Sequence, residues 1–135
     1  MIDVTVIGCG FMGRNHAHAA ADHPQMNLVS VVDLDKAVAQ EVAQKRGTTA
    51  TTDFERAVDD SEAVIVATPE PVHTEQAQTV LDRDRHLLLE KPVSVDTDEA
   101  WKLADRAAES DLATGVSFIL RYDPGYAGIH QAVSS

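Results

Sequence analysis

One stretch near the N-terminus, Val4–Gly13, constrains the fold most. Its sequence is VTVIGCGFMG, in which apolar, β-prone residues are followed by glycines with the spacing G-x-G-x-x-G. A strand that leads through such a turn into a helix predicts a phosphate-binding loop. Gly8 lets the chain leave the strand sharply, Gly10 lets backbone amides approach a diphosphate, and Gly13 lets the helix pack closely on the sheet. The unpaired amides at the helix start, together with the helix dipole, favour a bound anion.

The glycine spacing alone is a weak signal, but a second strand at 27–33 supports it. That strand ends in Asp33, which lies 20 residues past Gly13. This is the separation expected for a carboxylate that accepts the ribose hydroxyls of an adenosine. Asp33 would repel a 2′-phosphate, Leu34 brings no positive charge, and Lys36 is the one basic residue close by. The pattern therefore predicts NAD in preference to NADP, against the alternative of a turn and a strand-end acid that bind nothing.

The length and the net charge of the chain limit which classes of protein it can belong to. The chain has 135 residues, which is enough for one domain with a genuine core. Its formal net charge of −11 argues against nucleic-acid binding, which needs a basic surface. No apolar run approaches the roughly 20 residues of a membrane span, and Met1 leads directly into a strand, so we expect neither a membrane segment nor a signal peptide. A single cysteine excludes an intramolecular disulfide, and these features together predict a cytoplasmic protein.

Strand and helix patterns alternate along the whole chain. Such alternation implies right-handed crossovers and a parallel sheet covered on both faces. We therefore predict an α/β, Rossmann-type doubly wound, mainly parallel six-stranded sheet of order 3-2-1-4-5-6, with ligands bound where the order reverses. Strands are expected at 3–7, 27–33, 48–50, 63–68, 86–90 and 114–120. Helices are expected at 11–22, 35–46, 53–59 (with a capping box that starts at Thr52), 72–83, 96–110 and from 124 onward.

Residues that could take part in binding or catalysis follow two further strands. The fourth strand leads into Thr68 and Pro69, and His73 follows in the first turn of the next helix. A solvated or capping role for His73 is an equal alternative to a role in the site. The fifth strand leads into Glu90 and Lys91, where Lys91 could bind a substrate hydroxyl or help to remove its proton. The alternative is an ordinary surface ion pair between the two.

At this point the chain resembles a known family. The glycine turn GCGFMG, Asp33, Ala67-Thr68-Pro69 followed by His73, and Glu90-Lys91-Pro92 are together similar to the glucose–fructose oxidoreductase / inositol dehydrogenase / rhizopine-catabolism (Gfo/Idh/MocA) family. The resemblance covers essentially the whole chain, and Glu-Lys-Pro is its most specific part. It implies tight binding of NAD or NADP, and substrates that are sugars, inositols, nucleotide-sugars or similar polyols.

The resemblance also implies roles for individual residues. Lys91 would be the catalytic residue that reaches the substrate hydroxyl beside the nicotinamide, and its peptide bond to Pro92 is commonly cis in the family. Arg121 matches an arginine at the junction with a second domain. The residues implied in cofactor binding are Gly8, Gly10, Phe11, Met12, Gly13, Asp33, Leu34, Thr68, Pro69, His73, Glu90, Lys91 and Arg121.

Family members are more than twice as long, and their second domain forms the substrate pocket. We therefore expect residues 1–121 to be an NAD(P)-binding domain, and 122–135 to be the start of a connection to a C-terminal substrate and oligomerisation domain. Such a chain would bind dinucleotide without turning over a polyol, and surface left open by the missing domain could promote self-association. The alternatives are a stand-alone dinucleotide-binding regulatory or partner subunit, and a Rossmann domain of another reductase, which Glu-Lys-Pro argues against.

Three other residues are interpreted as structural. Cys9 fills a variable slot of the glycine turn where a small side chain fits. His16 and His18 are two residues apart on a helix, point to different faces, and make a poor metal pair. We therefore predict no metal site.

Overall fold

The computed structural model describes all residues from 1 to 135. A six-stranded sheet lies at its centre, with the order β3-β2-β1-β4-β5-β6 and parallel pairing throughout, which confirms the predicted topology. The strands are β1 (Ile2–Ile7), β2 (Met26–Val32), β3 (Thr49–Thr51), β4 (Ala63–Val66), β5 (His86–Leu89) and β6 (Thr114–Val116). The helices are α1 (Phe11–Asp22), α2 (Lys36–Arg46), α3 (Phe54–Asp59), α4 (His73–Asp82), α5 (Thr97–Ala108) and α6 (Pro124–Ser134), with 3-10 turns η1 (Glu70–Val72) and η2 (Ile119–Tyr122).

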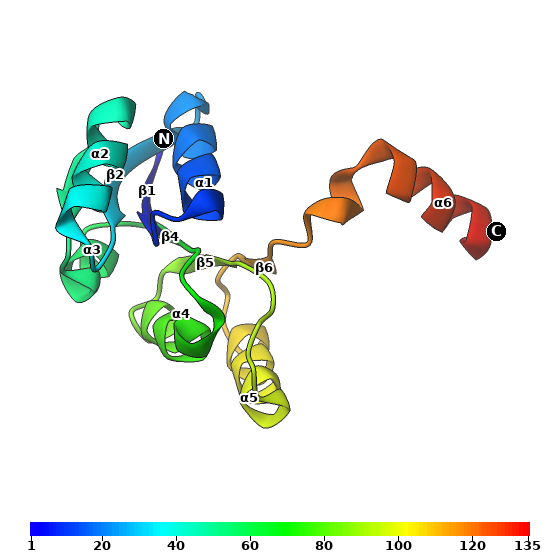
Figure 1. The fold of residues 1–135 in the computed structure, drawn as a ribbon. Helices are drawn as coiled ribbons and strands as arrows, with labels where there is room; N and C mark the ends of the chain where they lie inside the picture. Colours follow the sequence, from blue (N-terminus) through cyan, green and yellow to red (C-terminus); the bar gives the residue numbers. More distant parts are fainter.

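Helices cover the sheet from both sides, so that the core is divided into two layers (Figure 1). Successive strand residues point to opposite faces, and neighbours in β4 show the division: Val64 and Val66 pack with α3, α4 and α5, whereas Ile65 packs with α1 and α2. The central strands are accordingly apolar on both faces, as parallel strands require. This arrangement brings the carboxyl ends of β1, β2, β4 and β5 to one edge of the sheet.

Side-chain caps fix where several helices begin. Asp35 accepts hydrogen bonds from the first amides of α2, and Gly47 ends that helix with φ of 68°. Asp96 caps α5 as predicted, through the amide of Glu99 at 3.0 Å. The predicted capping box at Thr52 is wrong, because the cap of α3 is Asp53, whose carboxylate accepts from the Arg56 amide.

Several predicted boundaries extend too far. Strand β4 ends at Val66 rather than at residue 68, and α5 ends at Ala108. The largest difference is at β6, which was expected to reach residue 120 but ends at Val116, after which η2 begins. The physical reason is the loss of a partner: Ser117 still donates to the Leu89 carbonyl at 2.8 Å, but β5 ends there and its chain turns away.

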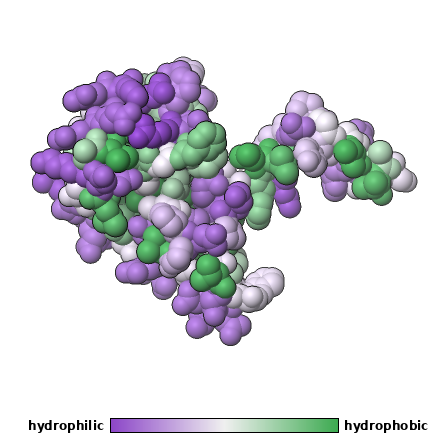
Figure 2. Space-filling model, viewed as in Figure 1, coloured by the Kyte–Doolittle hydropathy of each residue, from purple (hydrophilic) through white to green (hydrophobic).

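The C-terminal helix α6 stands away from the sheet and its helices (Figure 1). Apolar side chains are exposed from Phe118, the residue before η2, through α6 (Figure 2), including Ile119, Tyr122 and Ile129. No helix in the chain combines the length and the apolar character that a bilayer crossing demands.

Candidate functional site: a dinucleotide cavity at the carboxyl edge of the sheet

The glycine turn after β1 is defined by two close backbone approaches. Gly8 has φ of +92°, and a Cβ there would lie 2.5 Å from the Ala67 carbonyl oxygen. A Cβ on Gly13 would lie 1.7 Å from the Gly8 carbonyl oxygen. Side chains cannot be accommodated at either position without a backbone shift, so these two glycines bring α1 against the strand ends. Gly10 differs, because no atom lies within 4 Å of where its Cβ would be.

The open space beside Gly10 lies at the start of α1. Gly10 is the N-cap residue and offers no side-chain cap, and the first turn of α1 contains no acidic residue. Arg14 is the first residue whose amide bonds back to the Gly10 carbonyl, at 2.9 Å. The preceding amides of the first turn therefore have no intrahelical acceptor, and the positive end of the helix dipole is not neutralised. The turn has the space and the donors that a diphosphate requires.

Asp33 follows β2 and is held by two backbone amides. Its carboxylate accepts from Cys9 N at 2.9 Å and from Asp35 N at 2.9 Å. The first bond ties Asp33 to the glycine turn, and the second orders the chain before α2. Carboxylate oxygens have further lone pairs, so these bonds leave acceptor capacity for ribose hydroxyls.

The peptide of Cys9 is fixed from its other side by Arg14. The Arg14 Nε donates to the Cys9 carbonyl at 3.0 Å, and its guanidinium makes a two-pronged contact with Glu41 on α2 at 3.0 and 3.1 Å. The hydrogen bond from Arg14, with a second from Lys45, lowers the pKa of Glu41 to about 2. Burial, with the nearby charge of Asp33, raises the pKa of the Cys9 thiol to about 11, so the thiol stays protonated and serves packing rather than redox chemistry.

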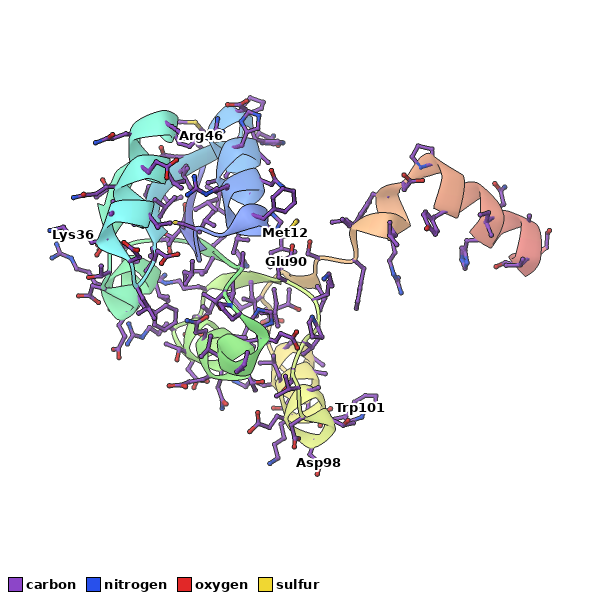
Figure 3. All side chains as sticks on the ribbon, viewed as in Figure 1. Met12, Lys36, Arg46, Glu90, Asp98 and Trp101 are labelled. Carbon is purple, nitrogen blue, oxygen red and sulfur yellow. The ribbon has the colours of Figure 1, made fainter.

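A cavity of about 880 Å³ opens along this edge of the sheet, within the size range of ligand sites. It runs from the end of β2 to the end of β5. Met12 on α1 and Glu90 after β5 both line it, and Figure 3 shows them near one another at the start of α1. Of the residues predicted from sequence, those that line the cavity are Gly8, Gly10, Met12, Asp33, Leu34, Thr68, Pro69, Glu90 and Lys91.

Four predicted residues lie outside that cavity. Gly13 is buried against Gly8, and its role is to pack α1 rather than to face a ligand. Phe11 is 82% exposed and does not line the cavity. His73 is buried beneath a loop, and Arg121 lies on a separate, smaller cavity. Direct contact of these four with a cofactor stays a prediction that this geometry does not support.

Half of the residues that line the cavity were not predicted from the sequence. Some of these residues follow strand ends, as Thr52 and Phe54 follow β3, and the rule used for Asp33 would have found them. Others come from the first turns of η1 and α4, which no strand-end rule indicates. The unpredicted lining residues are Ile7, Val32, Thr52, Phe54, Ala67, Pro71, Val72, Glu75 and Gln76.

His73 is buried beside the cavity and connects two of the loops at its edge. Its side chain is 1% exposed, with Nε2 at 2.7 Å from the Thr68 carbonyl and Nδ1 at 2.8 Å from the Pro92 carbonyl. Both partners can only accept, so a neutral ring donates to one carbonyl and a charged ring to both. The imidazole thus connects the loop after β4 to the turn after β5. The solvated alternative is wrong for this buried side chain, and contact of His73 with a cofactor stays a prediction.

Glu90 is buried at the end of β5, and its partner is not its neighbour Lys91. His16 Nε2 on α1 lies 2.7 Å from the Glu90 carboxylate, and the Lys91 amide donates to the other oxygen at 3.3 Å. Burial raises the pKa of Glu90, but hydrogen bonds from His16 and Ser117 and the charge of His16 outweigh it, so the pKa lies below its ordinary value. The surface-pair alternative for Glu90 and Lys91 is therefore wrong. His16 was missed as a site residue because 74 positions separate it from Glu90.

Lys91 lies where two cavities meet. It lines the dinucleotide cavity and also a second one of about 340 Å³, whose other walls are formed by residues 117–121. The ammonium group of Lys91 forms no ion pair with any residue of the chain. The Arg121 guanidinium, which also forms no ion pair, lies 5.7 Å from the centre of the Phe118 ring. The Lys91–Pro92 peptide bond is cis, as the resemblance implied.

Comparison with known proteins agrees with this geometry. A family model described as an oxidoreductase family with an NAD-binding Rossmann fold (Gfo/Idh/MocA) matches residues 2–118. The chain belongs to the Gfo/Idh/MocA oxidoreductase family. Its matched segment is the family's NAD-binding Rossmann domain, and it contains the glycine turn, Asp33 and the Glu90-Lys91-Pro92 element.

Several proteins similar to this chain are named as dehydrogenases. Inositol 2-dehydrogenase of Rubrobacter xylanophilus is 36% identical over 99% of this chain, which spans 40% of that protein. The structure of GenD2 from gentamicin A biosynthesis, in complex with NAD, superposes with a TM-score of 0.92 at 33% identity, covering 97% of this chain and 38% of GenD2. Myo-inositol dehydrogenase from Lactobacillus casei, solved with NAD(H) and myo-inositol, superposes with a TM-score of 0.90 at 25% identity. The match covers 99% of this chain and 41% of that protein. The chain thus spans about 40% of the length of its relatives.

Substitutions of the glycines test whether the turn after β1 binds the cofactor. Gly10→Ala adds a methyl group into the open cavity, so we expect little loss of stability but at least about a tenfold loss of NADH affinity. Gly13→Ala forces a Cβ against the Gly8 carbonyl, so we expect the free energy of unfolding to fall by about 1–3 kcal/mol. Chemical unfolding and NADH fluorescence titration measure the two effects. Gly128→Ala in α6, where the added Cβ also meets no atom within 4 Å, should change neither, and wild-type NADH affinity in Gly10→Ala would contradict the assignment.

His73 makes a second test. His73→Leu leaves the part-buried Thr68 and Pro92 carbonyls without their donor, so the free energy of unfolding should fall by about 1–3 kcal/mol. NADH affinity should fall as well, because the loop after β4 is no longer held to the turn after β5. Replacement of the exposed His130 by Leu provides the matched control, and an unfolding free energy within about 1 kcal/mol of wild type in His73→Leu would show that the bridge is not needed.

Proposed function

We propose that the chain is the NAD-binding part of a dehydrogenase that oxidises a CH–OH group of a sugar, polyol or nucleotide-sugar. The observation that carries the proposal is the position of Lys91, unpaired, at the edge shared by the dinucleotide cavity and a second cavity. The dehydrogenases named above, which act on inositol, support this substrate class.

The residues present divide the work between binding and proton transfer. The amides at the start of α1 hold the diphosphate, and Asp33 holds the adenine ribose. A nicotinamide bound there would supply the acceptor for the hydride of the carbinol carbon. Lys91 would contact the substrate hydroxyl and, once it has lost its own proton, would accept the hydroxyl proton, so that the alcohol becomes a carbonyl compound. Glu90 and Pro92 fix the backbone on either side of Lys91.

We further propose a division of the chain at residue 121. Residues 1–121 form the NAD(P)-binding domain, and 122–135 begin the connection to a domain that completes the substrate pocket. The family match up to residue 118, the separate position of α6 and the greater length of the relatives support this division. The exposed apolar residues of η2 and α6 would contact that domain, or a second copy of this chain in its absence.

The cellular location and the classes of partner are inferred from the net charge and the cysteine content. We propose a cytoplasmic protein, because its single cysteine is buried and reduced. Partners other than substrate and cofactor are not required: the net charge of −11 disfavours nucleic acid, and the helices give no reason to invoke a membrane.

The proposed function is tested on the 135-residue chain itself. It should bind NADH, seen as a change in nicotinamide fluorescence, and should not reduce NAD in the presence of myo-inositol or a sugar, because residues 1–135 span only about 40% of the length of the relatives. Lys91→Met should bind NADH with an affinity within about threefold of wild type, because the amine contacts substrate rather than cofactor phosphates. Steady oxidation of a polyol by the purified chain would refute the division of labour between the two domains.

The cofactor preference is tested at Asp33. We expect NADH to bind at least about tenfold more tightly than NADPH, because the 2′-phosphate would meet the Asp33 carboxylate. Asp33→Asn keeps an acceptor for the Cys9 amide while it removes the charge, so the preference should shrink. Asp35→Ser removes the neighbouring carboxylate and keeps a helix-cap oxygen, and it should leave the preference unchanged. Tighter NADPH binding by the wild type would overturn the assignment.

A further inference from the structure

Glu90 joins three parts of the site. Its carboxylate contacts His16 on α1 at 2.7 Å and accepts from the Lys91 amide at 3.3 Å, and Ser117 after β6 helps to lower the pKa of Glu90. The Glu90 and His16 side chains are 7% and 15% exposed, so little water screens the pair. Every contact of Glu90 is with a donor, which favours the ionised form of the carboxylate. When His16 donates through Nε2–H as a neutral imidazole, a net negative charge remains on Glu90 in the wall of the dinucleotide cavity.

The position of this charge along the cavity follows from the strand order. Asp33 follows β2 and Glu90 follows β5, with β1 and β4 between them. Strands are about 4.8 Å apart, so the two carboxylates lie roughly 14 Å from each other on either side of the glycine turn. A dinucleotide with its adenosine at Asp33 and its diphosphate at α1 extends its nicotinamide toward β4 and β5. Glu90 is the buried acid at that end.

We propose that the Glu90 carboxylate, held by His16, sets the preference of the site for the oxidised cofactor. The nicotinamide ring of NAD⁺ is cationic, whereas that of NADH is neutral. A fixed negative charge in a poorly solvated wall attracts the first and not the second. By linkage, tighter binding of the oxidised form lowers the reduction potential of the bound couple, by about 30 mV for each tenfold in the affinity ratio. The inference rests on NAD binding at this cavity and not on the proposed substrate.

The other charged residues that line the cavity would not have the same effect on the nicotinamide as Glu90. Glu75 on α4 is exposed at the rim, where water and salt screen it. Lys91 carries the opposite sign on a flexible, exposed side chain. The free chain offers Glu75 as a matched control, since it is a carboxylate of the same cavity that differs from Glu90 in burial.

The experiment measures the dissociation constants of NAD⁺ and NADH for the 135-residue chain by calorimetry. In Glu90→Gln, the affinity for NAD⁺ relative to NADH should fall by about tenfold, as expected for a charge several ångströms away at an effective dielectric of 20–40. In Glu75→Gln, the ratio should change by less than about twofold. A purely structural role for Glu90 would weaken both cofactor forms by the same factor, and that result overturns the proposal, as does an equal shift of the ratio in both variants.

His16 keeps the proposal testable if Glu90→Gln does not fold. His16→Leu removes the donor that favours the ionised carboxylate, so the ratio should shift in the same direction as in Glu90→Gln. His16→Gln keeps an N–H donor and should restore a ratio close to wild type. An unchanged ratio in His16→Leu overturns the role given to His16. Failure of the wild type to bind either cofactor form would instead refute NAD binding itself.

Discussion

The approach of α1 to the end of β1 is the contact on which the rest of the site depends. Gly13 lies so close to the Gly8 carbonyl that no side chain fits between them, and Gly8 has a backbone conformation that favours glycine. This contact places the start of α1 over the carboxyl edge of the sheet. The free amides of the helix therefore face the cavity next to Gly10, and the ends of β2, β4 and β5 lie around them.

Loops around this contact are fixed by polar side chains that bond to backbone. Asp33 accepts from the Cys9 amide, Arg14 donates to the Cys9 carbonyl, and His73 bridges the carbonyls of Thr68 and Pro92. The bonds of Asp33 and His73 join segments that follow different strands, and the bond of Arg14 holds α1 to the turn before it. Buried backbone groups that lack a partner cost free energy, so these side chains make one arrangement of the loops more stable than its alternatives. These bonds therefore fix the loops that line the cavity.

The local part of this architecture could be predicted from the sequence, and the long-range part could not. The glycine spacing and Asp33 follow from local pattern and strand order, and so does the placement of Lys91 at a strand end. The partner of Glu90 could not be predicted, because His16 is distant in sequence and helix periodicity only indicated that it was a poor metal ligand. The end of β6 was misjudged for a related reason: the β-prone run after Val116 has no strand left to pair with once β5 ends.

The charge pattern of the cavity explains how a chain of net charge −11 binds an anion. The long-range field repels a dinucleotide, and Arg14, the cation nearest the turn, is already paired with Glu41. Attraction must come at short range, from amides at the start of α1 that lie between two carboxylates, Asp33 and Glu90. That sequence of negative, positive and negative matches a molecule with ribose hydroxyl donors at one end, a diphosphate in the middle and a cationic ring at the other. Binding is therefore decided by the order of charges along the cavity and not by their sum.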